Sequence, residues 1–229
     1  MCLAGTLLLA SCGKSGSDKL PGLTQPQIDS ASYAFGLSIG ASLKQIDVQG
    51  LNYKQLIQGV IDMAEGRQLK ISEDMIGSIL QSFQIKMMEG KAQQKRAEEE
   101  AFMSENKKNE GVVETESGLQ YKIIEPGSEV KPAAADTVEV IYKGTTKDGK
   151  VFDDSANHGG TVKFPLNGVI RGWTEGLQYL GEGGKMVLYI PFDLGYGPQA
   201  LGPDAPGYST LIFDVELVKV YKAEENGDE

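Results

Sequence analysis

The chain has 229 residues and a net charge of −10, from 22 basic and 32 acidic side chains. This length allows one large domain or two small ones, each with a hydrophobic core. The negative charge excludes nucleic acid as the main partner, because phosphate binding needs a basic face. Cys2 and Cys12 are the only cysteines and His158 is the only histidine. A catalytic triad, a thiol protease and a His/Cys metal site are thereby excluded, and we expect neither a metal nor a cofactor.

The chain starts with a short apolar run that ends in small residues and a cysteine. It is too short to span a bilayer and predicts a signal peptide. Leu9-Ala10-Ser11-Cys12 resembles the lipobox of bacterial lipoproteins, in which the cysteine is lipidated and becomes the first residue after cleavage. We therefore expect residues 1–24 to comprise a signal, a lipid on Cys12 and a polar, glycine-rich tether. An ordinary secretory signal is the alternative.

Residues 25–111 are predicted to be helical. A capping box at Thr24–Gln27 opens a helix that runs to about Lys44. A second helix follows Asn52, and the apolar residues from Tyr53 to Ala64 recur at the spacing of one buried stripe. A third helix begins after Ser72.

The third helix has no obvious end before Gly111. From Glu89 to Glu110 the residues are mostly Lys, Glu, Gln and Ala, and proline is absent. A segment that is polar on nearly all sides is either a helical strut crossing solvent or disordered. We favour the strut, because it would link the helices to the next domain.

Residues 112–229 differ in character, with β-branched and alternating runs separated by Gly and Pro. Asp148-Gly149 is typical of a hairpin turn, and only one short helix fits, at Trp173–Leu180. Many strands around one short helix predict an antiparallel α+β domain. The expected strands are residues 119–124, 137–143, 150–152, 161–164, 185–190 and 210–220.

Candidate chemistry in this domain is sparse. The neighbours Asp153 and Asp154 could indicate acid–base or metal chemistry, but a solvated turn is the simpler interpretation of Asp154. The domain is rich in aromatic side chains, and in a small β domain most of these belong to the core.

Six segments of the domain follow one another as in a known family. They are Val140-Ile-Tyr-Lys-Gly144, Gly149-Lys-Val-Phe-Asp153, Gly168-Val-Ile-Arg-Gly-Trp-Thr-Glu-Gly176, Gly184-Lys-Met-Val-Leu-Tyr-Ile-Pro191, Leu194-Gly-Tyr-Gly197 and Ser209-Thr-Leu-Ile-Phe-Asp-Val-Glu-Leu217. The domain resembles the FKBP-type peptidyl-prolyl cis–trans isomerases. The preceding helices look like the dimerisation module of the macrophage infectivity potentiator subfamily. This resemblance rests on the segment Ala31-Ser-Tyr-Ala-Phe-Gly36, on the spacing of the helices and on the length of the linker.

The resemblance implies an antiparallel sheet wrapped around one short helix, with an apolar cleft between them. It implies that Trp173 forms the floor under the proline ring and that Phe152 and Phe213 form the walls. The Ile170 N–H and the Tyr196 hydroxyl would hold substrate carbonyls. The full expected cleft is Tyr142, bracing Asp153, with Phe152, Val169, Ile170, Trp173, Tyr196 and Phe213.

Some positions depart from the family pattern. His158 stands where an arginine would pair with the cleft aspartate, so we expect that ion pair to be absent or weaker. Val162 replaces a frequent cleft aromatic, Gly168 stands where an acidic residue can occur, and Leu201 stands where histidine is common. We expect these changes to affect peptide selectivity and macrolide affinity more than the activity itself.

The expected function is isomerisation of X–Pro bonds during folding of exported proteins. The partners would be unfolded or partly folded proline-containing polypeptides, a second copy of the chain through the amino-terminal helices, and macrolide inhibitors. The expected location is the bacterial cell envelope, on the periplasmic side or at the outer membrane, with the lipid as the membrane anchor. The alternative is an envelope chaperone or peptide-binding module whose turnover is incidental.

Overall fold

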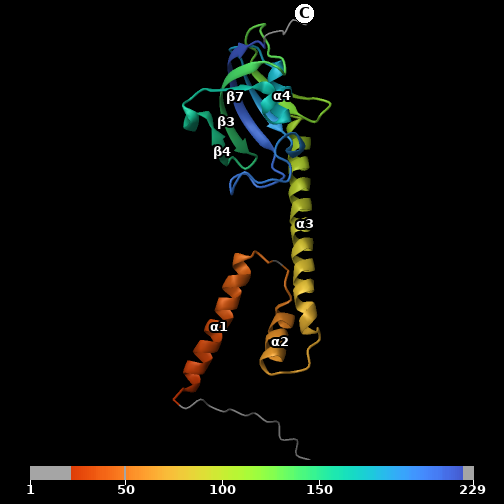
Figure 1. The fold of residues 1–229 in the computed structure, drawn as a ribbon, viewed down its shortest axis with the longest axis vertical. Coiled ribbons are helices and arrows are strands. Elements are labelled where there is room, and N and C mark those ends of the chain that lie inside the picture. The colour runs from red at the N-terminus through yellow and green to blue at the C-terminus, as the bar shows by residue number, and fades with distance from the viewer. Residues whose placement is uncertain (1–21, 49, 224–229) are drawn as a thin grey trace, which may run out of the picture. The chain divides into compact units, whose positions relative to one another are not determined.

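The computed structural model describes residues 22–48 and 50–223. These residues form two compact units that divide between Ser72 and Glu73 (Figure 1). The expected fold class is confirmed: a helical amino-terminal region precedes an antiparallel sheet with one short helix. The predicted signal segment with Cys12 lies outside the described residues.

The amino-terminal unit consists of α1 (Gln25–Gln45) and α2 (Tyr53–Ala64). Both helices start where the capping residues predict. The Thr24 N–H donates to Gln27 Oε1 at 2.8 Å, and the Asn52 side chain accepts from the Gln55 N–H at 3.2 Å. No residue of α1 is buried. Within a single chain, the apolar side chains of this helix therefore lack a covering surface.

The second unit begins with α3 (Glu73–Asn106), a single helix of 34 residues. The prediction of a helix rather than a disordered segment is correct, although α3 ends before Gly111. The expectation that its polar end is surrounded by solvent is wrong, because Glu99, Met103 and Asn106 are buried. The Asn106 amide donates to Gln120 Oε1 at 2.9 Å, and Gln120 Nε2 donates to the Met103 carbonyl at 2.8 Å. A domain boundary at residue 112 would cut these contacts.

The sheet of the second unit is antiparallel throughout, with strand order β1-β2-β6-β7-β3-β4, and β5 also pairs with β3. All the strands expected from the sequence are present, within a few residues. Strand β1 was not anticipated, because it has only three residues. The strands are β1 (Val112–Glu114), β2 (Gln120–Glu125), β3 (Thr137–Thr146), β4 (Val151–Asp154), β5 (Val162–Pro165), β6 (Lys185–Ile190) and β7 (Leu211–Tyr221).

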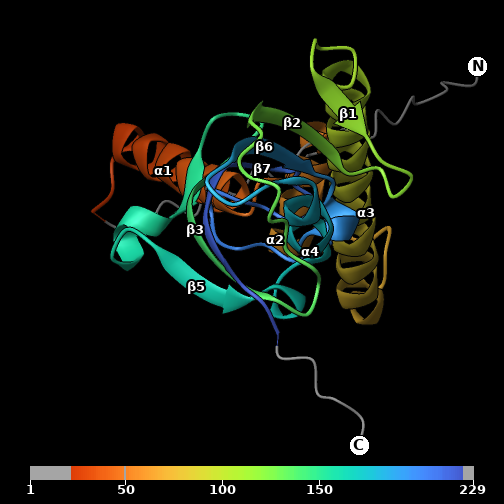
Figure 2. The same ribbon diagram turned by 90° about the horizontal axis from the view of Figure 1, so that it is seen from above.

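The sheet curves around helix α4 (Arg171–Gly176), which a short 3-10 turn at Leu177–Tyr179 extends (Figure 2). Leu177 and Leu180 after the helix and Leu188 and Ile190 on β6 are all fully buried. The close approach of helix and strand depends on glycine. A Cβ added at Gly172 would lie 2.4 Å from Ile190 Cγ2, well inside van der Waals contact.

We predict that Gly172→Ala destabilises the domain by about 1–3 kcal/mol, because overpacking a filled core forces side chains and backbone apart. Urea denaturation followed by circular dichroism measures the change. Gly90→Ala is the matched control, since Gly90 also lies in a helix but has no atom within 4 Å of the added Cβ. We expect this control to be neutral or stabilising. Equal stability of the two variants would contradict the proposed close packing.

Candidate active site

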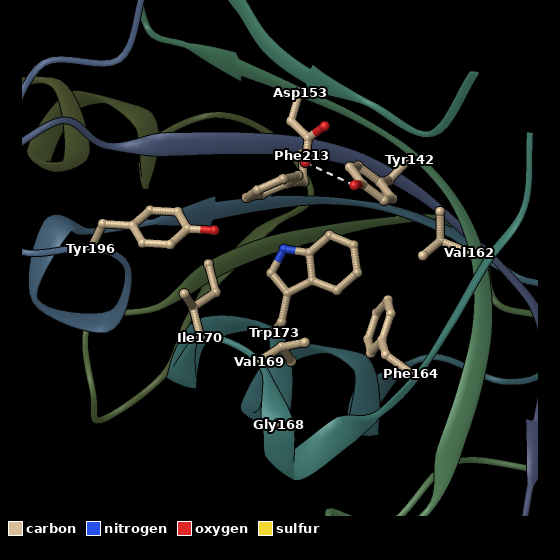
Figure 3. Close-up of a pocket in the computed structure, with 10 residues that line it drawn as sticks. All are labelled: Tyr142, Asp153, Val162, Phe164, Gly168, Val169, Ile170, Trp173, Tyr196 and Phe213. Carbon is tan, nitrogen blue, oxygen red and sulfur yellow. Dashed lines mark hydrogen bonds between the residues drawn. The ribbon is translucent and has the colours of Figure 1, made fainter. Parts of the chain in front are cut away.

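A cavity of about 450 Å³ lies on the concave side of the sheet, at the start of α4. Its lining comes from strands β3, β4, β5 and β7, from α4 and the segment that leads into it, and from the loop after β6. The lining residues are Tyr142, Asp153, Val162, Phe164, Gly168, Val169, Ile170, Trp173, Tyr196 and Phe213 (Figure 3).

Trp173 forms the floor of this cavity. Its side chain projects from the first turn of α4, and the residue is only 4% exposed. The rings of Tyr142 and Phe213 meet it edge-on, with centroids at 5.1 and 5.0 Å, and Phe164 lies at 5.4 Å. Such perpendicular contacts are favourable for aromatic rings and hold the indole in one orientation. The buried Trp173 Nε1–H has no acceptor among the described residues, so a donor remains available at the floor.

A second pair of rings supports one wall. Phe152 and Phe213 pack edge to face at 5.4 Å. Gly144 on β3 makes room for both, since a Cβ there would lie 2.8 Å from each ring. Phe152 therefore supports Phe213 from behind, and only Phe213 lines the cavity itself.

The polar edge of the cavity is centred on Asp153 at the end of β4. The Tyr142 hydroxyl donates to Asp153 Oδ2 at 2.8 Å, as the dashed line in Figure 3 shows. The other carboxylate oxygen accepts from the Asp154 N–H and lies 3.0 Å from His158 Nε2. A contact between His158 and Asp153 therefore exists, and it becomes an ion pair only when the imidazole is protonated.

Two tyrosines of the cavity have a pKa above the usual value for tyrosine. Burial raises the pKa of Tyr142, and the hydrogen bond to Asp153 raises it further. Burial also raises the pKa of Tyr196, with a smaller contribution from the negative charge of Asp153. Both hydroxyls are donors at neutral pH, as an ordinary tyrosine is, and the raised pKa keeps them so in more alkaline solution. The Tyr196 hydroxyl points toward Trp173 (Figure 3).

The structure brings together most of the residues expected from the sequence. One expected residue does not line the cavity, and two residues that line it were not expected. Leu201 lies on the loop behind Tyr196, is 45% exposed and borders a separate small pocket. Phe164 and Gly168 line the cavity but were not among the expected site residues. Phe164 could have been found, because it lies two residues from Val162 on β5 and alternate residues of a strand share a face.

Comparison with known proteins agrees with this geometry. Residues 128–218 match the family described as FKBP-type peptidyl-prolyl cis-trans isomerase, and residues 28–123 match the domain amino terminal to it. The chain belongs to the FKBP-type peptidyl-prolyl cis–trans isomerase family. It is thus an isomerase of X–Pro peptide bonds, as the sequence motifs predicted.

Several relatives of this isomerase are similar over most of its length. The chain is 43% identical to the probable FKBP-type isomerase FkpA of Neisseria meningitidis, over 83% of this chain and 73% of the relative. It is 38% identical to the outer membrane protein MIP of Legionella longbeachae, over 85% and 86% of the two chains. The crystal structure of FkpA from Escherichia coli superposes with a TM-score of 0.63 at 37% identity, covering 87% of this chain and 98% of that one.

The raised pKa of Tyr142 gives a prediction for the stability of the isomerase. The folded state holds this proton more tightly than the unfolded state, so its stabilisation is complete below about pH 10 and is lost as the pH rises further. We expect the free energy of unfolding to fall less steeply between pH 9.5 and 11.5 in Tyr142→Phe than in the wild type. Urea denaturation at several pH values measures this, with Tyr179→Phe as the control. If the free energy of unfolding falls equally steeply with pH in all three proteins, the pKa of Tyr142 is not raised in the folded state.

Proposed function

We propose that the cavity above Trp173 is the active site, and that it isomerises X–Pro bonds of exported proteins during folding. The observation that supports this most directly is the apolar floor: the Trp173 ring is surrounded by three other aromatic rings, with the hydroxyl of Tyr196 at the rim. Such a floor suits the flat face of a proline ring, and the rim can hold the flanking carbonyls.

An apolar cavity lowers the barrier to this rotation for a simple physical reason. Partial double-bond character holds the X–Pro bond planar, with a barrier of about 18–20 kcal/mol. At the twisted midpoint the imide loses its resonance and its carbonyl carries less charge, so water stabilises this state less than the planar one. Removing water therefore favours the transition state relative to the ground state.

The required stabilisation is moderate. Uncatalysed exchange takes about 10–100 s, and a turnover of about 10–1,000 per second needs a barrier lower by about 3–7 kcal/mol. Burial, orientation and one or two hydrogen bonds can supply this amount. The mechanism requires no nucleophile and no cofactor.

We assign the individual roles as follows. Trp173 supports the proline ring, and Phe213, backed by Phe152, forms a wall. The Tyr196 hydroxyl and the Ile170 N–H, at the residue before α4, donate to substrate carbonyls. Tyr142 orients Asp153. Val162 and Val169 contact the residues that flank the proline, whereas Leu201, also expected to bind substrate, does not line this cavity.

We predict that Tyr196→Phe lowers kcat/KM about two- to tenfold on a short proline peptide, the effect of losing one neutral hydrogen bond. A protease-free assay of cis–trans exchange measures it. The matched control is Tyr179→Phe, because Tyr179 is exposed to the same extent, 40%, but packs on Tyr121 and does not line the cavity. Full activity in Tyr196→Phe would exclude the hydroxyl from the mechanism.

We further propose that the amino-terminal helices form a homodimer. Large apolar side chains of α1 are open to solvent in the single chain, including Tyr33 at 72% and Phe35 at 73%. The first half of α3 shows the same pattern, with Leu80 at 62% and Met88 at 59% exposed. Apolar surface of this extent indicates an interface, and two-fold symmetry is the commonest way to close one.

We predict that the chain with Cys12→Ser, which removes the proposed lipid site, sediments as a dimer in analytical ultracentrifugation. Adding Phe35→Glu should shift it toward monomer, because a charge in an apolar interface is costly. Gln45→Glu in the same helix is the control and should leave the dimer intact. A Cys12→Ser chain that sediments as a monomer would refute the dimer.

The third part of the proposal is a lipid anchor on Cys12 at the bacterial envelope. The support is the Leu-Ala-Ser-Cys sequence at residues 9–12 and the similarity to a relative named as an outer membrane protein. None of the helices in the described part of the chain combines the length and apolar character needed to span a bilayer.

We predict that Cys12→Ser moves the protein from the membrane fraction to the soluble fraction of its host cell without changing its isomerase activity. Fractionation and metabolic labelling with a fatty acid measure attachment. If the variant remains in the membrane fraction and the wild type takes up no label, the anchor is not on Cys12.

A chaperone function remains the second candidate, because paired helical modules could hold an unfolded chain. Refolding of a large protein limited by proline isomerisation separates the two candidates. An isomerase role requires that Tyr196→Phe slows this refolding, whereas pure holding activity would be unaffected.

A further inference from the structure

The segment from Phe192 to Thr210 carries Tyr196 to the cavity, although little of it is regular structure. Two backbone hydrogen bonds tie Gly197, the residue after Tyr196, to Phe192 and Tyr208: the Gly197 N–H donates to the Phe192 carbonyl at 2.9 Å, and the Tyr208 N–H donates to the Gly197 carbonyl at 2.8 Å. The position of Tyr196 therefore depends on Phe192 and Tyr208, the residues that close the base of the loop.

Arg96 of α3 packs directly against this base. Its guanidinium carbon lies 4.3 Å from the centroid of the Tyr208 ring and 5.9 Å from that of Phe192. The two rings meet edge to face at 5.6 Å. A planar cation over an aromatic face is attractive, and a guanidinium stacks better than an ammonium.

Tyr208 needs such support because its backbone lies in the left-handed region, with φ of 63°. Side chains other than glycine are strained there, and the surrounding contacts must hold them in place. The Arg96 stack and the Phe192 ring are two contacts that do so.

Glu99, one turn further along α3, holds the end of the same segment. Glu99 is only 1% exposed, and its Oε2 accepts a hydrogen bond from the Thr210 N–H at 3.0 Å. Lys95 of the same helix pairs with the other carboxylate oxygen, and Lys147 of the β3–β4 turn lies 3.9 Å from it. A carboxylate this deeply buried is tolerated only when it is paired and hydrogen-bonded, so its contacts specify how the helix docks.

We propose that Arg96 and Glu99 are positioning residues for the isomerase reaction, acting through the loop that carries Tyr196. The last turns of α3 are thus part of the catalytic unit and not only a linker. This inference rests on the proposed role of the Tyr196 hydroxyl, and the experiment separates the two.

The test is a double-mutant cycle in the full-length protein. Arg96→Ala and Glu99→Ala should each lower kcat/KM on a short proline peptide about two- to fivefold. In a Tyr196→Phe background the same changes should have little further effect, because residues that act through one group are not additive. Glu99→Gln should restore much of the loss, since its side chain can still accept from Thr210.

Lys86→Ala and Glu98→Gln are the matched controls. Both side chains are exposed on α3, and neither contacts the loop base. Amide hydrogen exchange gives an independent readout: Arg96→Ala should speed exchange at Tyr208 at least threefold, and Glu99→Ala should do so at Thr210, while the controls change neither.

The outcomes separate cleanly. If Tyr196→Phe is fully active but exchange at Tyr208 and Thr210 rises as expected, the role of Tyr196 fails while Arg96 and Glu99 still hold the loop. If Tyr196→Phe loses activity but Arg96→Ala and Glu99→Ala do not, the positioning role is overturned. Additive losses in the cycle would also overturn it.

Discussion

The structure depends on the burial of one indole ring. Trp173 projects from a helix of only six residues, and that helix lies close enough to the sheet only because Gly172 has no side chain. The fully buried side chains of β6 occupy the remaining space. This packing fixes the depth of the cavity floor. The rings of Tyr142, Phe164 and Phe213 then fix the orientation of the Trp173 indole. The packing of the core therefore also sets the shape of the cavity.

The polar groups around the floor follow from the same burial. A tyrosine is already protonated at neutral pH, and partial removal from water raises the pKa of Tyr142 and Tyr196 further, so the hydroxyls remain neutral donors beside an aspartate. A neutral donor suits a reaction in which no proton is transferred and the carbonyl loses charge.

Helix α3 shows how a polar sequence can mislead. Arg96, Glu99 and Asn106 are residues typical of a solvated surface, yet two of them are buried and the third stacks on Tyr208. Each meets a partner from a distant part of the chain, such as Thr210 or Gln120. Polarity thus excludes burial in an apolar core but does not exclude burial in an interface with matched partners.

The sequence by itself determined the helices, nearly all strands, the fold class and the family. These features depend on local spacing: capping residues at Thr24 and Asn52, the Asp148-Gly149 turn, and aromatic residues within six ordered motifs. It also pointed to most of the cavity lining, because those residues lie inside the motifs. The tertiary structure alone decided that His158 reaches Asp153, that Leu201 borders a different pocket, and that the end of α3 docks at the base of the Tyr196 loop. The reason is physical: periodicity reports how a segment buries its own face, but it does not report which side chains meet across a turn or a fold. The contacts of α3 with Tyr208 and Thr210 join residues more than 100 positions apart, and no local pattern records such a pairing.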